Sequence, residues 1–309
     1  DDEILARVIS DSICMSSYKA AILGTDHKRI PHDVNINPTI MGHEFSGVIL
    51  ETGRKWEHRY KKGQKFCIQP AMVKTGTLNA PGYSYKYIGG AATNIIIPCN
   101  IIEADCLLDY EGEAFFPASL AEPMSCIVGA YNASYHVNPG TYEHKMGIKE
   151  KGNLAILGGA GPMGLGAIDY ALHSETRPSV ITVTDTNNER LARAESLLPG
   201  DMALKEGIKL KYINPTHFPD TVEYLRSLTE GKGYDDVFIF TPVKEVVELG
   251  DSILAADGCL NFFAGPTDNN FKAECNFYNV HYAFTHIIGT TGGNTEDLKE
   301  ALEMIKLKK

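Results

Sequence analysis

Asn153-Leu-Ala-Ile-Leu-Gly-Gly-Ala-Gly-Pro-Met-Gly164 is the stretch that decides the fold of this chain of 309 residues. An apolar run leads into the pattern Gly159-x-Gly161-x-x-Gly164, and a stretch of helical character follows at residues 165–172. In such a strand–turn–helix the first glycine makes a tight turn, the second lets the backbone approach a pyrophosphate, and the third lets helix and strand pack closely. The helix N-terminus then faces the phosphates. We therefore predict a dinucleotide site whose turn comprises Gly159, Gly161, Pro162, Met163 and Gly164.

An acidic residue follows this turn where a ribose-binding carboxylate is expected. Asp185 closes the next apolar run, residues 180–184, at about the twenty-residue spacing typical of this motif. A carboxylate here would accept hydrogen bonds from both ribose hydroxyls and repel a 2′-phosphate, which favours NAD(H) over NADP(H). Arg190 would soften that preference if its side chain folded back over the site, so NADP(H) stays open. The alternative is an unrelated glycine turn followed by a helix-capping aspartate.

The remainder of the chain changes character near residues 122–129. Up to about residue 122, short apolar runs broken by Gly, Pro and Asn indicate a mostly-β domain. Beyond residue 125, strand-sized runs alternate with helix-length segments, which predicts βαβ units and a parallel sheet. The predicted strands are residues 154–157, 180–184, 210–213, 237–240, 260–263 and 287–288. We therefore predict an α/β chain with a mostly-β domain at 1–124 and a Rossmann-type doubly wound sheet at 125–293.

Composition excludes several classes of protein. The formal net charge of -10 argues against general nucleic-acid binding, because a phosphate backbone requires clustered Lys and Arg. No apolar run is long enough to predict a membrane span. The seven cysteines are scattered and include no CxxC pair, so we expect neither a disulfide framework nor a four-cysteine zinc site. We also expect a reducing, cytoplasmic location.

Three separate segments carry residues of the kinds that bind metals. Met41-Gly-His-Glu-Phe-Ser-Gly47 places His43 beside Glu44, Cys14 lies upstream, and Glu122 precedes Pro123 at the predicted domain boundary. A catalytic zinc takes three protein ligands from Cys, His and carboxylate and keeps one position open. Spacing alone also fits a small buried cysteine and an inert histidine, so the pattern by itself leaves both interpretations open.

Taken in order, Cys14, Gly42-His43-Glu44, Glu122-Pro123 and the Gly159–Gly164 turn resemble the zinc-dependent medium-chain alcohol and polyol dehydrogenases. The resemblance covers essentially the whole chain. It is closest to the polyol and sugar-phosphate members, such as sorbitol and galactitol-1-phosphate dehydrogenases and, in residues 13–20 and 82–90, L-sorbose-1-phosphate reductase. It implies a GroES-like catalytic domain at 1–124, and at 294–309 the start of a return to that domain.

The activity that this resemblance implies is hydride transfer between NAD(P)H and the carbonyl or secondary alcohol of a polyol or ketose phosphate. L-Sorbose 1-phosphate, reduced to a hexitol phosphate, is the first candidate substrate. The alternatives are a sorbitol-type dehydrogenase of non-phosphorylated polyols and a non-catalytic dinucleotide-binding protein of the same fold. A zinc-free reductase of the superfamily is a further alternative, against which the metal-ligand set argues.

The resemblance also implies one catalytic Zn²⁺ that acts as a Lewis acid on the substrate oxygen. Cys14, His43 and a glutamate would hold it, with Glu44 and Glu122 both candidates, one bound directly and the other through water or during turnover. Many relatives have a Cys-x-Thr/Ser-Asp segment with a His two positions later. Here Ser16 keeps the hydroxyl and is the candidate to pass the proton, whereas Ser17 replaces the Asp and Lys19, a second candidate, replaces the His.

Further expectations concern the rim of the site. Residues 69–87 contain no cysteine, so no structural zinc is expected. Ligands lie at the carboxyl ends of parallel strands, which suggests a nicotinamide-side role for residues that follow the later strands, namely Thr241, Gly265 and Thr290. Basic residues that would anchor a phosphate, or simply be solvated loop charges, are Lys19, Lys28 and Arg29. Three tyrosines at 83, 85 and 87 alternate at strand spacing, which would place them on one face.

The ends of the chain also carry an expectation. The family has a strand ahead of the cysteine-bearing segment, yet this sequence begins about a dozen residues before Cys14 and stops in a helical run at 295–308. We therefore expect a version truncated at both ends that lacks strands in its small domain. The expected partner is a small sugar or polyol, without nucleic acid or membrane, and family members are usually dimers or tetramers, so a homo-oligomer is expected.

Overall fold

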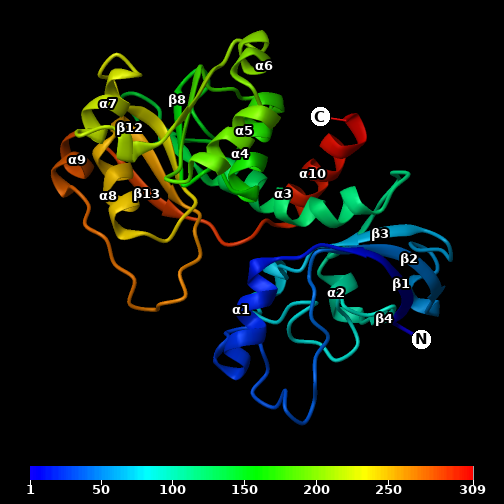
Figure 1. The fold of residues 1–309 in the computed structure, drawn as a ribbon. Coiled ribbons are helices and arrows are strands. Elements are labelled where there is room, and N and C mark those ends of the chain that lie inside the picture. The colour runs from blue at the N-terminus through cyan, green and yellow to red at the C-terminus, as the bar shows by residue number, and fades with distance from the viewer. Residues whose placement is uncertain (309) are drawn as a thin grey trace. The chain divides into compact units, whose positions relative to one another are not determined.

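The computed structural model describes residues 1–308, whose elements are labelled in Figure 1. The chain divides into two compact units. Unit 1 comprises residues 1–128 together with the segment from Gly292 onward, and unit 2 comprises Gly129–Thr291. Helix α3, Phe116–Ala133, contains the first point of division. No helix within residues 1–308 is both long and apolar enough to cross a bilayer.

Unit 1 is built on a five-stranded antiparallel sheet with the order β4-β1-β2-β3-β5. Its strands are β1 Ile4–Asp11, β2 Phe45–Thr52, β3 Lys65–Ile68, β4 Asn94–Ile97 and β5 Leu107–Asp109. Ile4 and Ala6 of β1 point into the core while Leu5 and Arg7 are exposed, as the period of a half-buried strand requires. Strand β1 precedes Cys14 and pairs with strands on both sides, as the family's order of elements implies.

Within residues 1–308, unit 1 also contains three further α-helices, α1 Met15–Leu23, α2 Cys99–Glu103 and α10 Thr295–Leu307. Three short 3-10 helices lie at Gly24–Asp26, Arg54–Trp56 and Val73–Thr75. Helix α10 begins with a capping box in which the Asn294 side chain accepts from the Asp297 amide, and the Asp297 carboxylate accepts from the Asn294 amide. Leu298 and Ala301 of α10 pack against Ala118 and Ala121 of α3, which attaches the C-terminal segment to the sheet domain.

Unit 2 is a six-stranded parallel sheet with the order β10-β9-β8-β11-β12-β13. Its strands are β8 Asn153–Leu157, β9 Val180–Thr184, β10 Lys209–Ile213, β11 Tyr234–Ile239, β12 Leu254–Phe262 and β13 His286–Gly289. In chain order this is the 3-2-1-4-5-6 arrangement of a doubly wound dinucleotide-binding fold. The predicted Rossmann-type α/β fold is thereby confirmed, and each of the six predicted strands overlaps one of these.

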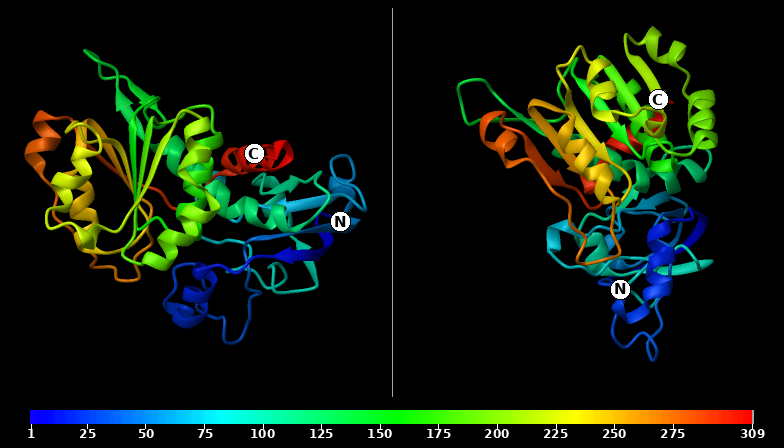
Figure 2. Two further views of the ribbon diagram at one scale, coloured as in Figure 1. Left: turned by 45° about the horizontal axis from the view of Figure 1, so that its top comes forward. Right: turned by 60° about the vertical axis from the view of Figure 1, so that its left-hand side comes forward.

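Helices cover both faces of this sheet (Figure 2). Helices α4 Pro162–His173 and α5 Asn188–Leu197 lie on one face, and α7 Thr221–Ser227 and α8 Lys244–Ser252 lie on the other. The remaining elements of unit 2 are the short helices α6 Gly200–Lys205 and α9 Phe277–Tyr282, a 3-10 helix at Pro215–His217, and an antiparallel hairpin of β6 Tyr135–Val137 and β7 His144–Met146. Strand β8 lies at the centre of the sheet, between β9 and β11, so that the glycine turn emerges where the strand order reverses.

Candidate functional site

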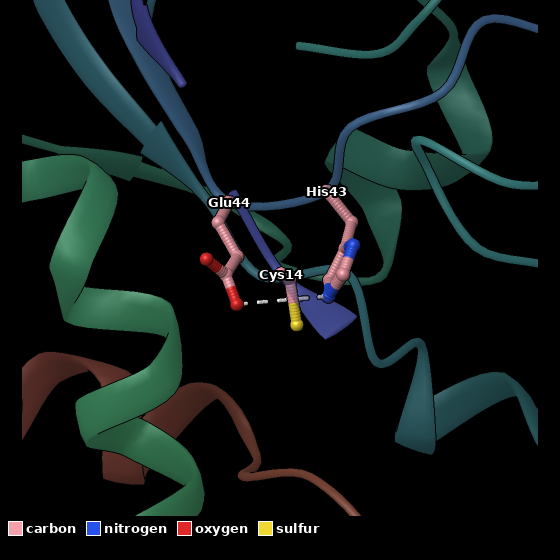
Figure 3. A group of neighbouring side chains, drawn as sticks. All are labelled: Cys14, His43 and Glu44. Atoms are coloured by element: carbon pink, nitrogen blue, oxygen red, sulfur yellow. Dashed lines mark ion pairs between the residues drawn. The ribbon is translucent and has the colours of Figure 1, made fainter. Parts of the chain in front are cut away.

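Cys14, His43 and Glu44 converge in unit 1 (Figure 3). One ligand atom of each, the cysteine Sγ, a ring nitrogen and a carboxylate oxygen, lie within 4.8 Å of one another. The His43 Nε2 and a Glu44 carboxylate oxygen are 3.9 Å apart, and Cys14 lies between the two other side chains in Figure 3. The structure thus brings together three of the four residues that the sequence predicted as metal ligands.

The pairing of two strands explains how these segments meet. Cys14 caps the N-terminus of α1 just after β1 ends, and His43 and Glu44 immediately precede β2. Strands β1 and β2 are antiparallel neighbours, so the end of one lies beside the start of the other. Gly42 adopts a φ of +93°, and a Cβ there would lie 2.5 Å from an Asp11 carboxylate oxygen, so this turn requires glycine.

Three hydroxyl groups hold the candidate ligands. The Ser17 Oγ lies 3.0 Å from His43 Nδ1, and the Tyr83 hydroxyl lies 3.1 Å from His43 Nε2. The Ser12 hydroxyl donates to the Glu44 carboxylate. The sequence reasoning did not assign these three residues to the site; for Ser17 and Ser12, closeness to Cys14 in the chain was the available signal.

Glu122 lies beside this cluster without joining it. It is buried on α3, and its carboxyl group is hydrogen-bonded to that of Glu44. The Cys126 thiol, one helical turn later, donates to Glu122 Oε1 at 3.7 Å. Of the two glutamates, Glu44 is therefore the one grouped with Cys14 and His43, and Glu122 is its direct neighbour.

The electrostatics of the cluster fit a bound divalent cation. Burial and the positive charge of Arg29 lower the pKa of His43 to about 4, so its imidazole is neutral at pH 7, as a metal ligand must be. Burial and the charge of Glu44 raise the pKa of Cys14 to about 11 and that of Glu122 to about 8. The acidic groups thus oppose each other's ionisation, and a cation among them would relieve this repulsion. A set of thiolate, imidazole and carboxylate suits zinc.

Ser16 and Lys19 both lie on α1. The Ser16 amide donates to Cys14 Sγ at 3.4 Å, and the Ser16 side chain hydrogen-bonds with both Cys14 and Tyr83. Lys19 is half-buried, and its charge contributes to lowering the pKa of His27, after burial and the charges of Arg29 and Lys28. Ser16 is therefore next to the cluster, whereas Lys19 belongs to a group of basic residues beyond it.

The expectation for the three tyrosines is wrong. Residues 81–90 form successive turns and contain no strand. Tyr83 is 4% exposed and stacks near His43, whereas Tyr87 is 55% exposed and the Tyr85 hydroxyl donates to Met72 Sδ. Pro81-Gly82 and Gly89-Gly90 enclose the segment, and such residues favour turns over a strand.

Unit 2 contains the second candidate site, a cavity of about 470 Å³ at the glycine turn. Helix α4 begins at Pro162, so its N-terminal amides and the positive end of its dipole face the turn. The predicted residues that line the cavity are Gly161, Pro162, Met163, Gly164, Asp185, Arg190 and Thr241. Sequence reasoning did not single out other lining residues, among them Gly158, Thr186 and Phe240. The structure therefore brings the Asp185 carboxylate and the glycine turn, the predicted ribose and phosphate contacts, to the same cavity.

The roles of the glycines differ in one respect from the prediction. The left-handed backbone of the turn is at Gly158, with a φ of +68°, and not at Gly159, which packs closely against Ile156. A Cβ on Gly164 would lie 2.0 Å from the carbonyl oxygen of Gly159, whereas a Cβ on Gly161 would meet open space. The glycine turn thus combines one left-handed position, one close contact and one open position.

Three predicted residues of unit 2 do not line this cavity. They are Gly159, Gly265 and Thr290. The Thr290 hydroxyl donates to the side-chain carbonyl of Asn261 at 3.2 Å, which ties the end of β13 to the neighbouring strand β12.

Comparison with known proteins gives the same assignment for both units. The alcohol dehydrogenase GroES-like domain family matches residues 1–103, and the zinc-binding dehydrogenase family matches residues 162–306. The chain is 53% identical to mannitol-1-phosphate 5-dehydrogenase of Aliivibrio fischeri over 98% of this chain and 71% of that protein. It is 48% identical to L-sorbose 1-phosphate reductase of Klebsiella pneumoniae over 100% of this chain and 74% of that protein.

A solved structure shares the fold at low sequence identity. A Sinorhizobium meliloti protein described as a zinc-binding dehydrogenase, with NADP bound, superposes with a TM-score of 0.75 at 18% identity, over 99% of this chain and 82% of that one. The similarity extends over both units, and the relatives at 48% and 53% identity are similar over nearly the whole chain. The chain therefore belongs to the zinc-binding medium-chain dehydrogenase family, whose members are oxidoreductases that act on CH–OH groups.

Proposed function

We propose that this protein transfers hydride between NAD(P)H and the carbonyl or secondary alcohol of a polyol or ketose phosphate. The observation that carries the proposal is the convergence of Cys14, His43 and Glu44 within 4.8 Å. A cysteine, a histidine and a carboxylate are a ligand set that leaves a zinc position open for substrate. We further propose one zinc per chain, because residues 69–87 contain no cysteine from which a structural site would be built.

The chain's own residues would divide the work at the site. Zinc, when bound, supplies Lewis-acid activation of the substrate oxygen. Cys14, His43 and Glu44 would hold it. Glu122, beside Glu44, would contact the zinc through a water molecule or replace Glu44 as a ligand during turnover. The Ser17 hydroxyl would fix the orientation of the His43 ring.

Proton transfer would fall to residues of α1. Ser16 is our candidate to pass the proton to or from the substrate oxygen, because its hydroxyl lies beside both Cys14 and Tyr83. Lys19 is the second candidate and lies further along the same helix. This assignment predicts that the hydroxyl, and not merely a small residue, is needed at position 16.

The cofactor would occupy the cavity at the β8–α4 turn, with its pyrophosphate at the start of α4. Asp185 lines this cavity and is placed to accept hydrogen bonds from the adenosine ribose, which favours NAD(H). Arg190 lines the same cavity and supports use of NADP(H) as the alternative.

Two substrate assignments follow from the relatives. L-Sorbose 1-phosphate, reduced to a hexitol phosphate, is the substrate named for the relative that is 48% identical. Mannitol 1-phosphate, oxidised at C5, is the substrate named for the relative that is 53% identical. Both are hexose-derived phosphate monoesters, and they differ in the distance between the phosphate and the reacting carbon. We place L-sorbose 1-phosphate first and treat a non-phosphorylated polyol as the further alternative.

The test combines metal content and turnover on one preparation of the full-length protein. NAD(P)H oxidation would be followed with L-sorbose 1-phosphate, free L-sorbose and fructose, and NAD(P)⁺ reduction with mannitol 1-phosphate. We expect about one zinc per chain, turnover of a phosphate ester, and loss of both in Cys14→Ser. Cys99→Ser, at a half-buried cysteine of the same unit that contacts Lys55, is the matched control. An intact wild type without zinc and without turnover of any of these compounds would overturn the proposal.

A further inference from the structure

A half-buried arginine stacks on the tyrosine that contacts the candidate metal ligand His43. The Arg29 Cζ lies 5.7 Å from the centroid of the Tyr83 ring, and that ring is 4.6 Å from the ring of His43. The Tyr83 hydroxyl contacts His43 Nε2 at 3.1 Å. Tyr83 therefore separates the guanidinium from the metal-ligand cluster by the width of one aromatic side chain.

The position of Arg29 is fixed from three sides. Its Nη1 donates to the Leu78 carbonyl at 3.1 Å, its carbonyl accepts from the Ser84 hydroxyl at 2.7 Å, and its amide donates to His27 Nδ1. The His27 ring stacks on Tyr83 at 5.7 Å with an interplanar angle of 8°. A guanidinium held in this way loses less side-chain freedom when it binds an anion than a mobile surface lysine does.

The charge of Arg29 has no carboxylate partner. Within residues 1–308, Arg54, Arg59 and Arg177 each form an ion pair with a carboxylate, whereas Arg29 forms none, as is also the case for Arg7, Arg190, Arg193 and Arg226. Lys28 and Lys19 add positive charge at the same place, because both act on the neighbouring His27.

An arginine near a substrate site, held in place and unpaired, matches the chemistry of phosphate recognition. The planar guanidinium donates two parallel hydrogen bonds to a phosphate, and such charge-assisted pairs are about twice as strong as neutral ones. Nη1 is engaged with Leu78, and the structure shows no hydrogen bond from Nη2 or Nε within residues 1–308, which leaves these donors for a ligand.

We propose that Arg29, supported by Lys28 and Lys19 and stacked on Tyr83, binds the phosphate group of the substrate and so selects a phosphorylated over a free sugar. This inference rests on the proposed function. It assigns the selectivity to one residue, with Tyr83 setting the separation between the phosphate and the metal-ligand cluster.

The test compares Arg29→Gln with wild type on phosphorylated and free sugars. We expect KM for the phosphate ester to rise about ten- to a hundredfold, as the loss of a charged hydrogen-bonded pair implies, with zinc content and turnover of free sugar unchanged. Arg29→Lys keeps the positive charge but loses the planar pair of N–H donors, so its KM for the phosphate ester should lie between those of wild type and Arg29→Gln. Arg54→Gln, which removes an exposed arginine paired with Asp1 in the same unit, should match wild type.

Other outcomes separate this inference from the proposed function. Normal KM for the phosphate ester in Arg29→Gln, or an equal loss with free sugar, would overturn the role of Arg29 while leaving the dehydrogenase assignment intact. If wild type turns over no phosphate ester, the proposed function fails, and calorimetry with L-sorbose 1-phosphate then decides the site by itself. Binding to wild type but not to Arg29→Gln would support the site, and equal or absent binding would overturn it.

Discussion

His43 is held between two hydroxyl groups, and each ring nitrogen has its own partner. Ser17 contacts Nδ1 at 3.0 Å, while Nε2 lies near Tyr83 and Glu44. In metal sites the partner of the second ring nitrogen fixes the tautomer and the ring orientation, and its loss weakens metal binding. Ser17 would therefore orient the His43 ring through a neutral hydroxyl if His43 binds a metal.

Replacing Ser17 tests this role. We expect Ser17→Ala to weaken zinc affinity about ten- to a hundredfold, because the His43 ring loses the contact that orients it. Competition with a chelator of known affinity measures the change. Ser17→Thr retains the hydroxyl and should bind zinc like wild type, and unchanged affinity in Ser17→Ala would show that the contact is dispensable.

Cys14, His43 and Glu44 could be predicted from sequence only through the resemblance to the zinc-dependent dehydrogenases, because their spacing alone also fits a buried cysteine and an inert histidine. Ser17 and Tyr83 could not, since their roles arise from contacts with His43 across 26 and 40 residues of chain. The same holds for the choice between the glutamates: the sequence offered Glu44 and Glu122, and only the packing of α3 against the site separates them.

At the scale of elements, the β8–α4 turn divides its functions among glycines in different environments. A Cβ at Gly164 would collide with the Gly159 carbonyl, whereas one at Gly161 would project into open space at the cavity. One position therefore serves the packing of helix on strand, and the other serves the approach of a ligand.

Two alanine substitutions should separate these functions. Gly164→Ala should destabilise unit 2 by about 1–3 kcal/mol, the usual result of overpacking a close contact. Gly161→Ala should leave thermal unfolding unchanged and weaken NADH binding, because its Cβ occupies space that the pyrophosphate needs. Unfolding curves and NADH fluorescence measure the two effects. Equal destabilisation by both variants would contradict this division.

Within unit 2, a buried histidine attaches the β6–β7 hairpin to the parallel sheet. His136 donates from Nδ1 to the Asp257 carbonyl at 2.9 Å, and its Nε2 lies 3.3 Å from both carboxylate oxygens of Asp236. Burial opposes the charged form of His136, yet the hydrogen bonds and charges of Asp236 and Asp257 outweigh it and raise its pKa above 6.5. The histidine ring is thereby favoured in its doubly protonated form, in which both nitrogens donate.

This raised pKa predicts a pH-dependent stability. Because the folded pKa of His136 exceeds its unfolded value, its contribution is complete below about pH 6.5 and is lost as pH rises through the raised pKa. The stability advantage of wild type over His136→Asn should therefore shrink between pH 6.5 and pH 8.5. Urea unfolding at the two pH values measures it, and an advantage that stays constant or grows would contradict the assignment.

The strands differ in how strongly the local sequence pattern predicts them. Three strands of unit 2, β8, β9 and β11, are buried almost throughout, as expected for central strands of a parallel sheet, whereas the edge strands β10 and β13 contain exposed positions. Strand β1 alternates buried and less buried positions, which is the period of a half-buried strand. The hairpin β6–β7 carries little apolar signal, because all three residues of β7 are exposed.

At the scale of the whole molecule, each unit contains one candidate site. The metal-ligand cluster lies wholly in unit 1, and the dinucleotide cavity lies wholly in unit 2. The fold class of each unit could be predicted from sequence. Short apolar runs broken by turn residues indicated the mostly-β unit, and strand-sized runs alternating with helix-length segments indicated the parallel sheet. The expected homo-oligomeric state and cytoplasmic location stay predictions, since they depend on surfaces and signals that these motifs do not encode.

The two ligands should therefore stabilise different parts of the chain. Zinc is expected to slow hydrogen exchange in residues 12–18 and 41–46, and NAD⁺ in residues 158–166 and 184–190, because each binds only the folded state of its site. A ligand at a hundred times its Kd contributes about 2.7 kcal/mol to that local stability. Mass-spectrometric hydrogen exchange with each ligand alone measures this. Protection of the same residues by either ligand would contradict the separation.

X-ray absorption at the zinc edge tests the central claim most directly, because it identifies the atoms around the metal. For protein loaded with one equivalent of zinc, the account predicts one sulfur at about 2.3 Å and the remaining ligands as nitrogen or oxygen at about 2.0–2.2 Å. The sulfur should disappear in Cys14→Ser and persist in Cys99→Ser. A zinc without sulfur in wild type, or one with several sulfurs, would contradict a site made by Cys14, His43 and Glu44.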